Sequence, residues 1–136
     1  EAAIHATRAF VMDPRSRSKV VLKIDFRNAF NAIERDCMLT AVRERIPSMY
    51  HFLWQCYSKP CHLLYGDSCI PSQTGCMQGD PFGPLLLSLT IHPIVEALQS
   101  SLNAWYLDDG TLGDSAYNVL RDFREIVSKA KEVGLE

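Results

Sequence analysis

Two adjacent carboxylates, Asp108 and Asp109, follow an apolar run from Leu102 to Leu107 and precede Gly110. This order predicts a β-hairpin whose tight turn is formed by the acids themselves. Neighbouring like charges repel each other, so placing two ionised carboxylates side by side costs free energy unless a cation neutralises them. The pair is therefore a candidate Mg²⁺ site, although an Asp-Asp pair taken alone is more often a solubilising surface turn.

A third carboxylate, Asp25, ends a second strand-like segment further upstream. Side chains alternate between the two faces of a strand. Asp25 therefore lies on one face of this segment, and the other face is apolar, formed by Val20, Leu22, Ile24 and Phe26. The same alternation in the later segment places Tyr106 and Asp108 on one face. If the two strands pair, Asp25 and Asp108 project from one face at neighbouring strand ends. Three carboxylates there could bind two hard cations, which clamp the attacking and leaving oxygens of a phosphoryl transfer.

The composition is that of one globular domain with a real core, since the 136 residues are 47% hydrophobic and 22% charged. The longest apolar stretch, Leu85 to Val95, is interrupted by polar residues and Pro93, which argues against a membrane span. The five cysteines form no Cys-x-x-Cys pair, so we expect reduced thiols in an intracellular protein. A net charge of −2 counts against a nucleic-acid binder that acts alone, unless bound metal ions or basic neighbouring segments offset it.

Periodicity and turn residues predict an alternation of helices and hairpins. The first part of the chain is predicted to form a helix over 1–12, a polar turn over 13–18, a strand over 19–26, and two helices over 35–46 and 47–59. A hairpin over 61–74 follows, and then a helix that is entered through the loop 75–84 and ends at Ser100. The hairpin with the acid pair and a helix over 115–133 complete the predicted order. This order fits an α+β domain with helices on one face of an antiparallel sheet.

Two apolar patterns are expected to fill the core. The aromatic residues between Tyr50 and Tyr57 have helical spacing, which favours core packing over base stacking. The last helix carries a broad apolar stripe, made of Val119, Leu120, Phe123, Ile126, Val127 and Ala130.

Three segments taken together resemble reverse transcriptases. The segment Leu22–Asn31 resembles motif A of that family, Gln78–Pro84 resembles motif B, and Tyr106–Gly110 resembles motif C. Each motif alone is a weak pattern, but the three occur in the expected order across essentially the whole chain. Their order and spacing agree with non-LTR (LINE-like) retrotransposon polymerases. The resemblance implies a palm with part of the fingers, which is a ferredoxin-like antiparallel sheet backed by helices.

The resemblance also implies an RNA-directed DNA polymerase. By this resemblance Asp25 and Asp108 would bridge two Mg²⁺ ions, for which Mn²⁺ is a possible substitute. Asp109 would be a supporting carboxylate, and the main-chain carbonyl of Phe26 would be a further ligand. One ion would activate the primer 3′-hydroxyl, and the other would hold the incoming triphosphate. The implied partners are an RNA template, a DNA primer and deoxynucleoside triphosphates, with no membrane. The implied location is the cytoplasm and nucleus, and the oligomeric state stays open.

Further residues acquire substrate-binding roles through the resemblance. Phe30, five positions after Asp25, stands where the family has its sugar-selecting aromatic, which leaves no room for a 2′-hydroxyl. Gln78 and Gly79 would border the nascent base pair, the glycine allowing close approach of the backbone. Tyr106 would lie against the primer end. The structural alternatives are core packing of Phe30, a plain loop-to-helix turn at Gln78 and Gly79, and a buried edge tyrosine.

The family's upstream fingers motifs and its thumb are not found in this sequence, and the chain opens with Glu1 instead of methionine. We therefore expect a piece of a retrotransposon polyprotein with little polymerase activity of its own. An RNA-dependent RNA polymerase would be expected to have an acid in place of Phe30 and Gly-Asp-Asp at the hairpin, which argues against that class. A non-enzymatic nucleic-acid-binding scaffold, or a relic derived from a reverse transcriptase, stays open, although such scaffolds typically lose the metal carboxylates that are present here.

Overall fold

The computed structural model describes residues 1–16 and 19–136 of the chain. These residues divide into two compact units, each described here by itself: Glu1–Arg27 with Ile91–Glu136, and Asn28–Thr90. The turn expected over 13–18 begins with the short 3-10 helix η1 (Pro14–Ser16), while Arg17 and Ser18 lie outside the described residues.

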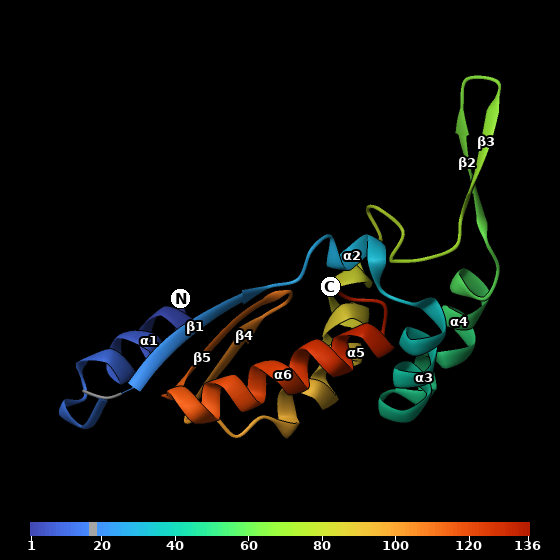
Figure 1. Ribbon diagram of the computed structural model, residues 1–136. Helices are drawn as coiled ribbons and strands as arrows, with labels where there is room; N and C mark the ends of the chain where they lie inside the picture. The colour runs from blue at the N-terminus through green and yellow to red at the C-terminus, as the bar shows by residue number, and fades with distance from the viewer. Residues whose placement is uncertain (17–18) are drawn as a thin grey trace. The chain divides into compact units, whose positions relative to one another are not determined.

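The first unit contains a three-stranded antiparallel sheet with strand order β1-β5-β4, which Figure 1 shows as three neighbouring arrows. The strands are β1 (Lys19–Asp25), β4 (Leu102–Tyr106) and β5 (Asp109–Ser115). β1 pairs with β5 along its whole length, so β5 is the central strand. The end of β1 therefore lies beside the beginning of β5.

Helices contact both faces of this sheet. α6 (Ala116–Glu132) packs against β1 and β5, and its residues line a cavity with Ile24 and Phe26. α1 (Ala2–Met12) contacts β4 and β5 from the other face, where it lines a second cavity with Lys23 and Tyr106. The predicted α+β class with an antiparallel sheet is confirmed. The prediction that helices lie on one face of the sheet is wrong, because α1 contacts the face opposite to α6.

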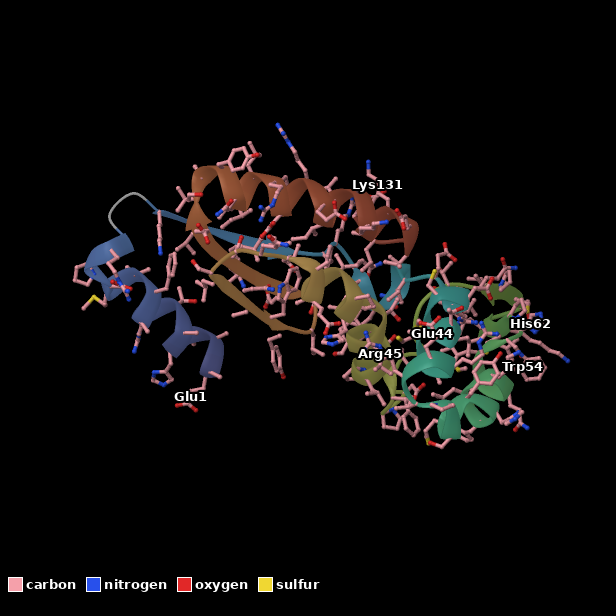
Figure 2. The ribbon with its side chains drawn as sticks, turned by 90° about the horizontal axis from the view of Figure 1, so that it is seen from below. Glu1, Glu44, Arg45, Trp54, His62 and Lys131 are labelled. Carbon is pink, nitrogen blue, oxygen red and sulfur yellow. The ribbon has the colours of Figure 1, made fainter. Side chains whose placement is uncertain are left out.

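Burial along α6 differs from the expected stripe. Val119, Ile126 and Ala130 are buried, but Leu120, Phe123 and Val127 are 39–49% exposed. Phe123 and Val127 line the open cavity that α6 forms with Ile24 and Phe26, so they are only partly covered, and the expected core position is wrong for these two and for Leu120. Figure 2 labels Lys131 near the C-terminal end of this helix, where its side chain extends from the ribbon.

The second unit consists of short helices and a separate hairpin. Its elements are α2 (Ala29–Ala32), α3 (Arg35–Arg45), α4 (Pro47–Tyr57), β2 (Cys61–Tyr65), β3 (Ser68–Ser72) and the beginning of α5 (Gly83–Ala97), which crosses the unit boundary after Thr90. α3 and α4 pack against each other, and Pro47 begins α4, where a missing N–H costs nothing. The short helix α2 has no counterpart among the expected elements.

The aromatic residues of α4 are mostly not in the core. Tyr57 is buried and Tyr50 is half-buried, but Phe52 and Trp54 are about half exposed (52% and 47%), so the expected core packing is wrong for these two. Figure 2 shows Trp54 on α4. None of the helices in the described ranges is long and apolar enough to span a membrane.

α5 ends at Ala97, three residues before the expected Ser100. The backbone N–H groups of Gln99 and Ser100 donate to the buried carboxylate of Asp122 at 3.0 and 2.7 Å. A side chain on α6 thus takes the hydrogen bonds that would otherwise continue the α5 ladder, and the sequence pattern of α5 gives no sign of this.

Candidate active site

The acid pair lies at the β4–β5 hairpin, but one residue away from the expected position. Tyr106 pairs with Asp109, so the two-residue turn consists of Leu107 and Asp108, and Asp109 is the first residue of β5. The expectations that both acids form the turn and that the strand extends to Leu107 are wrong. Leu107 has a φ of 55°, in the left-handed region that bulky residues rarely adopt.

Asp25 ends β1 and is exposed, as expected. Its register partner is Asp109 and not Asp108, because β5 lies between β1 and β4. Asp108 is connected through the main chain, since the N–H of Phe26 donates to its carbonyl oxygen at 3.3 Å. The structure therefore brings all three acids to the same end of the sheet.

Tyr106 is the register partner of Asp109 in the β4–β5 ladder, so the two side chains share a face of the sheet. Its side chain is 73% exposed, which excludes the alternative of a buried edge tyrosine. A largely exposed ring beside the acids can contact a ligand directly.

Lys23 places a positive charge among the three aspartates Asp25, Asp108 and Asp109. Its Nζ donates a hydrogen bond to Oδ1 of Asp109 at 2.7 Å. This hydrogen bond, together with the negative charges of Asp25 and Asp108, raises the pKa of Lys23 above its usual value. Lys23 thus stays protonated and offsets part of the negative charge, although water screens a pair whose side chains are 66% and 50% exposed.

An indole ring supports both acid-bearing segments from the opposite face of the sheet. Phe26, which is buried and directly follows Asp25, stacks on Trp105 with ring centroids 5.8 Å apart. Gly110, which directly follows Asp109, is so close to the indole that an added Cβ would lie 2.6 Å from a ring carbon. The glycine after the acid pair is therefore required by this close approach.

The donor atoms fit a hard divalent cation. The carboxylates of Asp25, Asp108 and Asp109 are the oxygen ligands that Mg²⁺ prefers, and Lys23 already places positive charge among them. Within the described ranges, no group of three or more histidine, cysteine, aspartate or glutamate side chains is arranged to hold an ion. The three aspartates therefore match Mg²⁺ in the type of their donor atoms and in their position at one end of the sheet, and their side chains would turn toward one another around a bound ion.

Phe30, Gln78 and Gly79 belong to the second unit, where the structure brings them together. They line one cavity of about 330 Å³, which is completed by Asn31, Cys76, Met77, Asp80, Gly83 and Pro84. Main-chain hydrogen bonds connect the two segments, because Cys76 donates to the carbonyl oxygen of Phe30 at 2.7 Å. Phe30 is half-buried, so it both packs and faces the cavity.

Gly75 makes this close approach possible. Its φ is 70°, and an added Cβ would lie 2.5 Å from the main-chain atoms of Phe30 and Asn31. The N–H of Gly75 donates to the carbonyl oxygen of Ile33 at 2.8 Å. Only glycine can occupy this position without moving the backbone.

Gln78 and Gly79 are the exposed central residues of a turn from Met77 to Asp80. The turn is closed by a hydrogen bond of 3.1 Å from the N–H of Asp80 to the carbonyl oxygen of Met77. Gly79 has a φ of 85°, which suits the third position of a type II turn.

Two buried residues that bind the loop before and around Gln78 and Gly79 were not predicted to have a role: Arg35 and Tyr57. Arg35 is 5% exposed and donates to the carbonyl oxygens of Ser72 and Gly75 at 2.9 and 3.0 Å. Tyr57 is 2% exposed, accepts from the N–H of Met77 and donates to the Asp80 carboxylate. An arginine at the start of a helix gives no sign in the sequence that it is buried, and Tyr57 differs in no visible way from its exposed aromatic neighbours.

Comparison with known proteins gives a family and a fold. Residues 3–136 match the family described as reverse transcriptase (RNA-dependent DNA polymerase). No curated protein sequence matches the chain significantly.

Among solved structures, the chain is similar to telomerase from Candida albicans in complex with a TWJ fragment of telomeric RNA. The TM-score is 0.68 at 11% identity, over 98% of this chain and 28% of that one. It is also similar to apo telomerase from Candida tropicalis, with a TM-score of 0.67 at 9% identity, over 98% of this chain and 30% of that one. At these identities the likeness shows the fold, and the chain spans less than a third of either telomerase chain. Because the family match covers nearly its whole length, the chain belongs to the reverse transcriptase (RNA-dependent DNA polymerase) family.

Proposed function

We propose that this chain is the palm, with part of the fingers, of an RNA-directed DNA polymerase that adds deoxynucleotides to a primer 3′-hydroxyl. The observation that carries the proposal is the meeting of the motif carboxylates in a member of this family. Asp25 pairs with Asp109, and Phe26 bonds to the main chain of Asp108.

In this proposal Asp25, Asp108 and the carbonyl oxygen of Phe26 hold Mg²⁺, with Asp109 as a supporting carboxylate. Bound Mg²⁺, or Mn²⁺ in its place, would supply Lewis-acid activation of the primer hydroxyl and neutralise charge on the triphosphate. The chain's own residues fix the geometry, because the β1–β5 pairing holds the acid-bearing backbone and the exposed Tyr106 is available to the primer end.

The cavity of the second unit is proposed to take the sugar and base of the deoxynucleotide. Phe30 would exclude a 2′-hydroxyl, while Gln78 and Gly79 would border the base pair. Replacing Phe30 with alanine is then expected to let the enzyme incorporate ribonucleotides alongside deoxynucleotides. Unchanged sugar selection by Phe30→Ala would remove Phe30 from this role.

The order and spacing of the motifs further support an origin in a non-LTR retrotransposon polyprotein, acting inside the cell on an RNA template with a DNA primer. One similar telomerase is bound to an RNA fragment, which is compatible with RNA as a ligand of this chain. Since the chain spans less than a third of those telomerase chains, we assign the activity to a longer protein that contains it.

The test is Mg²⁺-dependent primer extension on an RNA template by the full-length polymerase containing this chain. Wild type is compared with Asp108→Asn, and with Asp67→Asn as a control that removes an exposed carboxylate from the β2–β3 hairpin. We expect deoxynucleotide incorporation by the wild type and Asp67→Asn, and none by Asp108→Asn. A folded wild type that binds RNA but incorporates nothing would refute the polymerase and favour the scaffold.

A further inference from the structure

The turn that presents Gln78 and Gly79 is held by a phenol from outside the three motifs. The hydroxyl of Tyr57 accepts a hydrogen bond from the N–H of Met77 at 3.1 Å and donates one to the carboxylate of Asp80. Met77 and Asp80 are the first and last residues of the turn. A single oxygen atom on α4 therefore binds both ends of the two-residue segment that faces the cavity.

The other Asp80 oxygen extends this arrangement toward α5. Oδ1 of Asp80 accepts from the N–H of Phe82 at 2.8 Å, just before the helix begins at Gly83. The carboxylate thus connects the turn both to the phenol and to the start of the following helix. Rotation of the Asp80 side chain is restricted from two sides.

Tyr57 is itself fixed in place. Its side chain is 2% exposed, and the guanidinium of Arg35 lies over its ring, 5.4 Å from the centroid. Arg35 also binds the carbonyl oxygens of Ser72 and Gly75, which precede the turn. Burial, and then the hydrogen bond with Asp80, raise the pKa of Tyr57 far above its usual value, so its hydroxyl stays protonated and keeps donating.

We infer that Tyr57 and Asp80 are positioning residues that orient Gln78 and Gly79 against the incoming nucleotide. This inference rests on the proposed polymerase function. Neither residue is among the proposed metal ligands, and both act on the turn that presents Gln78 and Gly79. Losing the arrangement should therefore weaken nucleotide binding and base discrimination more than the chemical step.

The test uses Tyr57→Phe, which removes the hydroxyl and keeps the buried ring under Arg35. The matched control is Tyr50→Phe, which removes a hydroxyl from the same helix at a half-buried position. Steady-state incorporation of one deoxynucleotide is measured with the full-length polymerase on an RNA template, for the correct and for a mismatched base. A second variant, Asp80→Ala, and the double variant show whether both residues act through one contact.

Tyr57→Phe removes two hydrogen bonds, so we expect it to raise KM for the correct deoxynucleotide at least about fivefold, which is the equivalent of one hydrogen bond of average net strength, with kcat nearly unchanged. Discrimination against the mismatched base should fall, and Tyr50→Phe should match wild type. The effects of Tyr57→Phe and Asp80→Ala should not add in the double variant.

Three results would overturn the inference. The first is an unchanged KM and base discrimination in Tyr57→Phe. The second is a fall in kcat and thermal stability alone, which is the signature of a merely structural role. The third is full additivity in the double variant. If wild type and Tyr50→Phe also fail to incorporate, the proposed function itself is refuted, so the two failures are distinguishable.

Discussion

Asp25 and Asp109 face each other across the last register pair of the β1–β5 ladder. Directly opposed residues of an antiparallel pair have Cβ atoms about 4.5–5.5 Å apart, and like charges at that separation destabilise the sheet. The Nζ atom of Lys23, 2.7 Å from Asp109, relieves part of this repulsion. The sheet thus tolerates two facing carboxylates because a cation lies beside them, and a bound divalent ion would compete with that cation.

Replacing Lys23 with glutamine should therefore strengthen divalent-ion binding by the chain. Two unit charges about 4 Å apart interact by about 1 kcal/mol in water, and Mn²⁺ carries two charges, so removing the lysine charge is worth about 2 kcal/mol. We therefore expect Mn²⁺ to bind about thirtyfold more tightly at low salt. The measurement is free Mn²⁺ by electron paramagnetic resonance during titration. Lys129→Gln is the control, because it breaks a comparable exposed ion pair with Glu132 at 3.0 Å on α6. Equal affinities in wild type and Lys23→Gln would show that the lysine does not compete with the ion.

Gly110→Ala should destabilise the first unit. The new Cβ would lie 2.6–2.7 Å from the ring of Trp105, so the indole must move and lose its stacking on Phe26. Overpacking of this kind costs about 1–3 kcal/mol, which urea unfolding measures. The control is Gly83→Ala, whose Cβ would meet Cys76 at an ordinary 3.6 Å, and whose stability should be close to wild type. If both variants were equally stable, the indole contact would not restrict this position.

Two glycines of the second unit should respond differently to alanine. Gly79 has a φ of 85° but open space around it, so Gly79→Ala should cost only the left-handed strain of about 1–2 kcal/mol. Gly75 has a φ of 70° and would also place its Cβ 2.5 Å from the main chain of Asn31. Urea unfolding should therefore show a larger loss for Gly75→Ala, and equal losses would contradict the described approach of the two segments.

Asp122 should make the stability of the chain depend on acid pH. Burial opposes its ionisation, but hydrogen bonds from Ser100, Arg121 and Gln99 outweigh that effect, and its pKa in the folded chain is lowered from 3.8. The unfolded chain then binds the proton more readily, so this stabilisation is complete above the unfolded pKa and is lost as pH falls through the folded one.

The variant that tests this is Asp122→Asn, compared by urea unfolding at a series of pH values. At neutral pH it should lose about 1–3 kcal/mol, because a buried hydrogen-bonded carboxylate is replaced. Its stability should then decline less steeply than that of wild type below about pH 4. Asp67→Asn, at an exposed position, should follow the wild-type curve. If the free energy of unfolding fell equally steeply below about pH 4 for wild type and for Asp122→Asn, Asp122 would not contribute to the pH dependence of stability.

Sequence patterns predicted most of the elements because those patterns are local. Alternation identified β1, Pro47 marked the start of α4, and the glycines and prolines of 75–84 marked a specialised loop. The same local patterns could not tell which side of an amphipathic helix is covered, so Leu120 and Trp54 were wrongly expected in the core.

For the site, residue type and order along the chain were enough to identify the carboxylates that can supply oxygen ligands and the residues at the motif positions. That Asp25 faces Asp109 and that Asp108 lies in the turn became known from the folded chain, because strand register depends on hydrogen bonds between strands that are distant in sequence. The same holds for the contact of Tyr57 with the turn at Gln78, which joins α4 to a loop 20 residues later. Burial and long-range hydrogen bonding are properties of the packed chain, so no local pattern along the sequence encodes them.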